Sequence, residues 1–196
     1  MSSPSPLSTP LILGSSSRFR QQIFRSMGYD FTIMNPDIDE KSFRNSDPEL
    51  LAVELARAKA NAIAALVRDP SIIITADQVV VVGDEIREKP TTPDEARQFL
   101  RSYRTTPAVT VSAINVINME TGKTATGVDR VKVHLKFLSD DIIEAIIAEG
   151  TIFHCAGGFA IEHPLMEPLV EKIDGERESV MGMPVTLTRR LLREVA

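Results

Sequence analysis

Small polar and basic residues near the start of the chain could bind a phosphate. The turn Gly14-Ser15-Ser16-Ser17 follows the apolar run Leu11–Leu13 and is followed by Arg18 and Arg20. Apolar residues at helical spacing come next, so the pattern predicts a strand, a turn and a helix. Such a turn directs backbone amides and the positive end of the helix dipole toward an anion. An ordinary helix cap is the alternative, and the sequence has neither a GxxxxGK[ST] P-loop nor a GxGxxG motif.

A carboxylate in an apolar strand is the second feature that could do chemistry. Asp77 interrupts the β-branched run Ser71–Val82, which is typical of a central strand covered on both faces. Burying an unpartnered carboxylate there costs on the order of several kcal/mol in lost hydration. We therefore expect Asp77 to belong to a hydrogen-bond network or to a catalytic site, and we favour catalysis.

Other charged residues leave two interpretations open. Asp37, Asp39 and Glu40 follow a predicted strand and could form either a metal site or a solvated acidic turn. Lys59 lies in a long amphipathic helix, where most lysines are on the surface. Glu162 is a lone carboxylate beside paired glycines, which either admit a ligand or make a tight turn.

The composition excludes several classes of function. With 196 residues, 43% hydrophobic and 25% charged, the chain can bury a substantial core. Its net charge of −5 argues against binding a nucleic-acid polymer. The single Cys155 rules out an intrachain disulfide and suits a cytoplasmic protein. No apolar run is long enough to span a membrane, and residues 1–10 look like a loose Ser/Pro-rich leader before a single domain over 11–196.

The elements that must position these residues alternate along the chain. Helices are predicted at 20–27, 48–68, 93–103, 140–149 and 184–192. Strands are predicted at 11–13, 31–34, 71–82, 85–90, 108–118, 129–137 and 169–174. This alternation, with a hairpin in the middle, predicts an α/β fold with a mixed sheet flanked by helices and two lobes around a central cleft.

Six motifs in order make the chain resemble the Maf family from residue 11 to residue 192. They are Ser15-x-Ser17-x-x-Arg20, Asp37-x-Asp39-Glu40, Lys59, Asp77 within TADQVV, Lys89-Pro90, and CAGGF with Glu162. The resemblance implies an elongated fold like that of inosine triphosphatase, often dimeric. It also implies a metal-dependent hydrolase that cleaves nucleoside triphosphates between the α and β phosphates and releases pyrophosphate.

The resemblance also assigns roles to particular residues. Asp77 is the expected catalytic base, because attack by water needs a base within hydrogen-bond reach. Glu40 and Asp77 are the expected ligands of a divalent cation, Mg²⁺ or Mn²⁺, together with the phosphates. The residues expected to bind the triphosphate are Ser15, Ser17, Arg20, Lys59 and Lys89.

Three positions bear on the preferred base. Family members acting on TTP and UTP resemble one another in having Arg, Thr and Gln where this chain has Phe19, Gln78 and Glu162. The residues present here resemble instead the branch acting on 7-methyl-GTP, which has an aromatic residue, Gln and Glu at these positions. The base of 7-methyl-GTP is cationic, and the face of an aromatic ring attracts a cation.

Arg18 and Glu88 depart from the family pattern and could lower activity. The alternatives are a TTP/UTP pyrophosphatase and a non-catalytic nucleotide-binding regulator of cell division.

Overall fold

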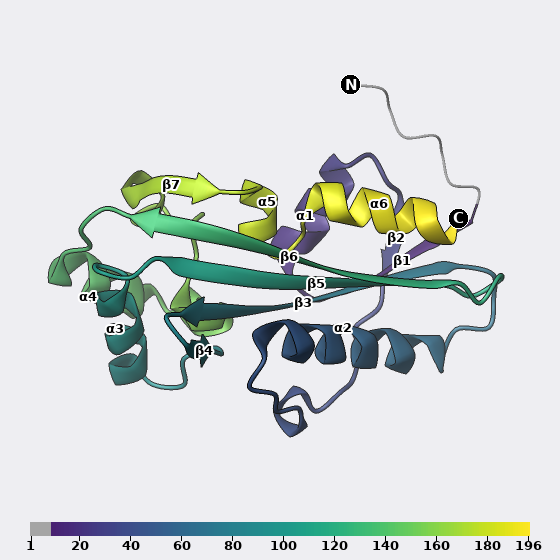
Figure 1. Ribbon diagram of the computed structural model, residues 1–196, viewed down its shortest axis with the longest axis horizontal. Coiled ribbons are helices and arrows are strands. Elements are labelled where there is room, and N and C mark those ends of the chain that lie inside the picture. Colours follow the sequence, from purple (N-terminus) through teal and green to yellow (C-terminus); the bar gives the residue numbers. More distant parts are fainter. Residues whose placement is uncertain (1–8) are drawn as a thin grey trace. The chain divides into compact units, whose positions relative to one another are not determined.

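The structure, a computed structural model, describes residues 9–196, so the leader predicted for residues 1–10 falls almost wholly outside the described residues. Within them one seven-stranded sheet has the order β2-β1-β3-β5-β6-β7, and β4 pairs with β3 (Figure 1). The strands are β1 Leu11–Gly14, β2 Phe31–Ile33, β3 Ile72–Val82, β4 Glu85–Arg87, β5 Ala108–Asn118, β6 Thr124–Leu135 and β7 Val170–Asp174. The helices are α1 Arg18–Ser26, α2 Pro48–Ala64, α3 Pro93–Ser102, α4 Asp140–Glu149, α5 Arg177–Val180 and α6 Val185–Val195.

The chain divides into two compact units. Unit 1 contains the residues up to Asp77, together with Ser112–Asp129 and Gly182–Ala196. Unit 2 contains Gln78–Val111 and Arg130–Met181. Strands β3, β5 and β6 each contribute residues to both units.

In unit 1, parallel strands bring the predicted phosphate turn to the same sheet edge as Asp77. Strand β1 pairs in parallel with β2 and with β3, and Gly14 is in register with Thr75. The carboxyl ends of parallel strands share one edge of a sheet, which is where α/β proteins bind ligands. The parallel pairing of β1 with β3 therefore brings the turn after Gly14 and the Asp77 carboxylate to the same edge of the sheet.

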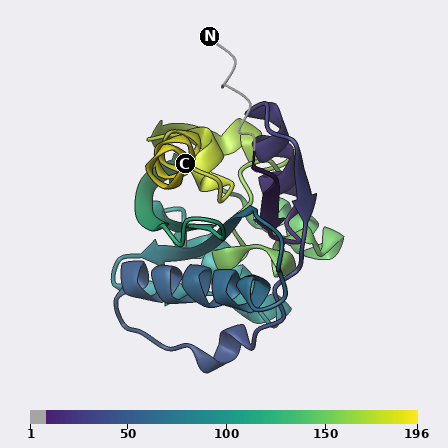
Figure 2. The same ribbon diagram turned by 90° about the vertical axis from the view of Figure 1, so that its right-hand side faces the viewer.

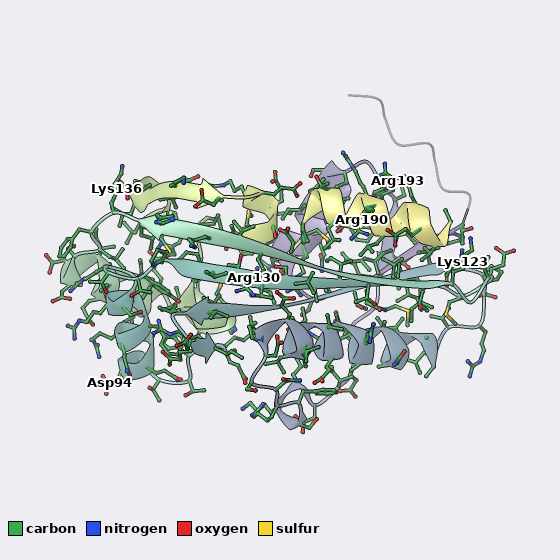
Figure 3. All side chains as sticks on the ribbon, in the orientation of Figure 1. Asp94, Lys123, Arg130, Lys136, Arg190 and Arg193 are labelled. Carbon is green, nitrogen blue, oxygen red and sulfur yellow. The ribbon has the colours of Figure 1, made fainter. Side chains whose placement is uncertain are left out.

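Helices α2 and α6 cover opposite sides of the unit 1 part of the sheet, as Figures 1 and 2 show. Ala52 and Ala56 of α2 pack with Ala113 of β5, all fully buried, because small side chains let the helix approach the strand closely. On the other side, a Cβ on Gly127 of β6 would lie 2.6 Å from a methyl group of Leu187 in α6. Arg190 and Arg193 lie on the exposed side of α6 (Figure 3).

Unit 2 has an apolar core of its own. Phe99 and Leu100 of α3 pack with Ile143 and Ile146 of α4 and with Val133 of β6 in one buried cluster. The helix boundaries follow their capping residues. The caps are Thr92 and Ser139 at the N-termini of α3 and α4, Pro93 at the start of α3, and Gly150 in the left-handed conformation at the end of α4.

The predicted α/β class and mixed sheet are confirmed, because β1, β2 and β3 are parallel while β4 and β7 pair antiparallel with their neighbours. The main difference is β6, which begins at Thr124 rather than near Asp129. Within residues 9–196, no helix combines the length and apolarity needed to cross a membrane. The elongated shape, the central cleft and the single domain over 11–196 stay predictions.

Candidate active site

The turn between β1 and α1 is held by its own serines. Ser17 is the N-cap of α1 and its hydroxyl accepts a hydrogen bond from the Arg20 amide at 3.4 Å. The Ser15 hydroxyl, in a residue that is only 5% exposed, accepts one from the Ser17 amide at 3.2 Å. Each hydroxyl keeps its proton as a donor, so the turn is preformed and can still donate to a phosphate oxygen. Glycine at position 14 allows close packing, because a Cβ there would lie 2.6 Å from Cγ2 of the buried Thr75 on β3 and 2.5 Å from Cδ1 of Ile63 on α2.

Lys59 joins the two carboxylates that the resemblance assigns to a metal. Its Nζ lies 2.5 Å from Oδ1 of Asp77 and 2.7 Å from Oε1 of Glu40. The side chains of Lys59 and Asp77 are 8% and 9% exposed, whereas that of Glu40 is 47% exposed. Lys59 is therefore not the surface lysine that its helix alone would favour. Asp37 and Asp39 are exposed, and Asp39 caps the short turn Glu40–Ser42, as expected of a solvated acidic turn; of the three carboxylates, Glu40 is the one that pairs with Lys59.

Arg20 belongs to the same cluster but its guanidinium is already largely occupied. Its Nε donates to the Gly182 carbonyl at 3.0 Å and its Nη1 to the Ala76 carbonyl at 2.9 Å. Burial lowers the pKa of Arg20 from its ordinary value, while the charges of Asp77 and Glu40 act to raise it. An arginine remains protonated at neutral pH, so its positive charge acts on the two carboxylates that also bind Lys59.

Gln78 follows Asp77 on β3 and belongs to unit 2. Its Nε2 donates to the backbone carbonyls of Ser179 and Val180, at 3.0 and 3.1 Å. The last carbonyls of a helix accept hydrogen bonds from outside its repeating backbone ladder, and the Gln78 amide is one such donor to α5. The residue expected to influence base choice thus also holds the end of α5.

Glu162 and Lys89 both act on the Cys155 thiol of unit 2. Burial is the main cause that raises the pKa of Cys155 to about 11, with Glu162 raising it further and Lys89 lowering it. Burial likewise raises the pKa of Glu162, against the lowering effects of its own backbone amide, of Arg177 and of His163. The structure therefore brings Lys89 and Glu162 to one neighbourhood of unit 2. Phe19 is half-buried in the first turn of α1, in unit 1.

Tyr103 anchors the glycine-rich turn and was not expected from the sequence. Its buried hydroxyl donates to the Gly157 carbonyl at 2.7 Å, and the Gly157 amide donates to the Glu88 carbonyl at 2.8 Å. Gly157 has a φ of 63°, and a Cβ on it would lie 2.6 Å from the Tyr103 oxygen. The hydrogen bond between Tyr103 and Gly157 joins residues that are 54 positions apart, so no local sequence pattern predicts it. Together the two hydrogen bonds of Gly157 link Tyr103 to the Glu88 carbonyl, immediately before Lys89.

Among residues 9–196, no group of three or more His, Cys, Asp or Glu side chains is arranged to hold a metal ion by itself. The two carboxylates that share the Lys59 nitrogen are a smaller donor set. Mg²⁺ is commonly bound by one or two carboxylates together with substrate phosphates rather than by a complete protein cage. Glu40 and Asp77 fit that mode of binding.

Comparison with known proteins gives one family. The family model described as "Maf-like protein" matches residues 10–195. A 7-methyl-GTP pyrophosphatase of Dictyostelium discoideum is 44% identical over 196 residues, covering 96% of this chain and 98% of the relative. A 7-methyl-GTP pyrophosphatase of Vibrio vulnificus is 32% identical, covering 89% of each chain. A dTTP/UTP pyrophosphatase of Desulforamulus reducens is 33% identical, covering 94% of this chain and 95% of the relative.

A solved structure, a nucleoside-triphosphatase/dITP/XTP pyrophosphatase from Mycobacterium abscessus, aligns with a TM-score of 0.39 and 13% identity, covering 65% of this chain and 74% of that one. The family model covers nearly the whole chain and the relatives are similar over nearly their full length. This chain belongs to the Maf family.

Proposed function

We propose that this chain is a nucleoside triphosphate pyrophosphatase that hydrolyses 7-methyl-GTP to 7-methyl-GMP and pyrophosphate, clearing a modified nucleotide from the pool. The observation that carries the reaction class is the buried Asp77 carboxylate, which shares the Lys59 ammonium with Glu40. Family membership and relatives named nucleoside triphosphate pyrophosphatase support the same class. The 44% identical relative named 7-methyl-GTP pyrophosphatase supports the substrate.

The charge balance of the cluster supports a divalent cation. Arg20 and Lys59 bring two positive charges to the negative charges of Glu40 and Asp77. A triphosphate would add several negative charges to a group that is already neutral, and a divalent cation offsets them. Glu40 and Asp77 would hold Mg²⁺ or Mn²⁺, which supplies Lewis-acid stabilisation of the charge on the departing pyrophosphate.

The chain's own residues perform the remaining steps. Ser15 and Ser17 donate to phosphate oxygens from the preformed turn, and Lys59 and Lys89 provide positive charge. Asp77 takes a proton from water, whose oxygen forms a bond to the α-phosphorus. The bond from the α-phosphorus to the bridging oxygen breaks, and its electron pair leaves with pyrophosphate. Positioning and electrostatics supply most of the rate enhancement in such a reaction.

The choice of base is assigned to Phe19, Gln78 and Glu162. Methylation at N7 makes guanine cationic, and the face of an aromatic ring attracts a stacked cation. A carboxylate accepts the two neighbouring N–H donors of guanine and opposes the positive charge. Glu162 suits this role because a partly buried carboxylate interacts more strongly with a cationic base than an exposed one does. The same burial raises its pKa, and a cationic base beside it would favour the ionised form. Uracil and thymine present a different pattern of donors and carry no positive charge.

A substrate panel tests this proposal. Release of pyrophosphate is measured for 7-methyl-GTP, GTP, TTP and UTP, each with Mg²⁺, with Mn²⁺ and without metal. We expect the highest kcat/KM for 7-methyl-GTP and no turnover without metal. The triple variant F19R/Q78T/E162Q, which carries the residues of the TTP/UTP branch, should shift the preference toward TTP and UTP. A wild-type preference for UTP would support the TTP/UTP alternative, to which the 33% identical relative belongs.

The non-catalytic alternative is tested with Asp77→Asn. Nucleotide binding without turnover in the wild type would favour a regulator of cell division over an enzyme. Turnover in the wild type that survives in Asp77→Asn would instead contradict the role of Asp77.

A homodimer and a cytoplasmic location stay part of the proposal. Light scattering coupled to size-exclusion chromatography tests the first, and fractionation of cells tests the second.

A further inference from the structure

His163 is the hydrogen-bonding centre of the loop that carries Glu162. Its side chain is 3% exposed. Its backbone amide donates to the Ala160 carbonyl at 3.1 Å. Its own carbonyl accepts hydrogen bonds from the amides of Met166 and Glu167, each at 2.8 Å. The backbone on both sides of Glu162 is thus tied to this one residue.

Both ring nitrogens of His163 are also bound. Nδ1 accepts a hydrogen bond from the Leu165 amide at 3.2 Å, and Nε2 lies 2.7 Å from Oε2 of Glu149. Because Nδ1 accepts from a backbone N–H, it carries no proton, and Nε2–H donates to the carboxylate. The network therefore assigns the Nε2–H tautomer. Glu149 is the last residue of α4, so the loop is fastened to the end of a helix in the same unit.

The two ring contacts differ in how easily water can replace them. The Leu165 amide lies within the loop, and the imidazole that accepts from it is buried. The Glu149 carboxylate is 52% exposed at its side chain, so water can reach it. Losing the acceptor inside the loop leaves the amide of the half-buried Leu165 without this partner, and we expect this to cost more than losing a contact to a carboxylate that water reaches. Nδ1 is therefore the more important ring atom.

We propose that His163 is a positioning residue for Glu162: by accepting from Leu165 and donating to Glu149, it sets the backbone that presents the Glu162 carboxylate to the base of the nucleotide. The inference rests on the proposed function, which assigns base recognition to Glu162. A group that must meet two donors on a base has to be held in a fixed geometry by its neighbours. His163 does not touch the substrate, so its loss weakens recognition of the base and leaves the hydrolytic step intact.

Three substitutions at position 163 separate the two ring contacts. His163→Ala removes both. His163→Asn keeps an acceptor close to the position of Nδ1, and His163→Gln keeps a donor close to the position of Nε2. We expect His163→Ala to lower the ratio of kcat/KM for 7-methyl-GTP to that for UTP about tenfold, through a higher KM for 7-methyl-GTP at unchanged kcat. His163→Asn should restore most of the ratio. Glu149→Ala should change the ratio least, because water can replace the lost carboxylate. His163→Gln, which loses the acceptor for the Leu165 amide, should lower the ratio more than Glu149→Ala does.

His134→Ala is the matched control. His134 also belongs to unit 2 and pairs with a carboxylate, Asp174, at 3.4 Å, but its side chain is 34% exposed and it lies on β6 rather than in the loop that carries Glu162. It should leave the ratio unchanged. A loss of folded protein lowers kcat for every nucleotide alike, so a selective rise in KM separates positioning from instability.

The outcomes distinguish this inference from the proposed function. A wild-type protein that does not prefer 7-methyl-GTP overturns the function on which the inference rests. A wild-type protein that prefers it, with His163→Ala keeping the wild-type ratio, overturns the inference alone. A readout independent of activity is the tautomer of His163 in a long-range ¹H–¹⁵N spectrum of histidine-labelled protein. The inference requires Nε2–H, and a protonated Nδ1 in the neutral ring would contradict it.

Discussion

Replacing Lys59 by Met should destabilise unit 1 because it leaves Asp77 buried without its cation. Removing one partner of a buried ion pair typically costs about 3–5 kcal/mol. We expect the low end, about 3 kcal/mol, because the charge of Arg20 still acts on Asp77. The lost contact to the half-exposed Glu40 adds only about 0–1 kcal/mol.

The double variant K59M/D77N isolates this cause. It carries no buried charge at either position, so it should be more stable than K59M alone. Free energies of unfolding are obtained from urea titrations followed by far-UV circular dichroism, with each transition fitted separately if the two units unfold apart. The coupling energy between the two positions should be about 2 kcal/mol or more.

Lys123→Met is the control for loss of a lysine. Lys123 is exposed at the turn between β5 and β6, and its Nζ lies 3.1 Å from the carbonyl oxygen of Ala196 (Figure 3). Its replacement should change the free energy of unfolding by less than about 0.5 kcal/mol. If the effects of Lys59→Met and Asp77→Asn add within about 0.5 kcal/mol, the buried pair does not exist as described and the reasoning is refuted.

Three further predictions concern Arg20, Glu162 and Cys155. Arg20→Lys cannot reach the carbonyls of Ala76 and Gly182 together, so kcat/KM should fall about tenfold or more in the pyrophosphate assay; an unchanged value would contradict the tethering role. Because burial raises the pKa of Glu162 above its unfolded value, ionisation opposes folding. Glu162→Gln should therefore be more stable than the wild type at pH 7, with the advantage disappearing below the unfolded pKa of about 4.3; a lower urea midpoint at pH 7 would argue against this. The pKa of Cys155 is raised to about 11, so its thiol should react slowly with iodoacetamide at pH 7 in the folded protein and faster as the pH approaches 11; fast alkylation at pH 7 would contradict the raised pKa.

Much of unit 1 follows from local patterns. The β-branched run over Ile72–Val82 identified β3. Asp77 was identified because a carboxylate is costly to bury in such an apolar strand. The partners of Asp77 could not be obtained in the same way. Lys59 looks like any helix lysine in sequence, and only the packing of α2 against the sheet shows that it is buried. The sequence pattern thus predicts the strand that carries Asp77, whereas the pairing of Asp77 with Lys59 depends on tertiary packing.

Contacts between residues distant in sequence were the least predictable. Arg20 donates to Gly182, 162 residues away, and Gln78 donates to Ser179, 101 residues away. These acceptors are backbone carbonyls, which every residue has, so no side-chain pattern marks them. The early start of β6 was missed for a related reason. Its first residues include Gly127, which suits the approach of Leu187 from α6 but weakens the strand pattern.

Pyrophosphate release from 7-methyl-GTP by the wild type and by Asp77→Asn, measured with Mg²⁺ and with UTP as the comparison substrate, tests the catalytic role of Asp77. We expect the wild type to prefer 7-methyl-GTP clearly and Asp77→Asn to lose at least about a hundredfold in kcat, because a general base is removed. Hydrolysis that proceeds equally well in Asp77→Asn would show that Asp77 is not the catalytic base.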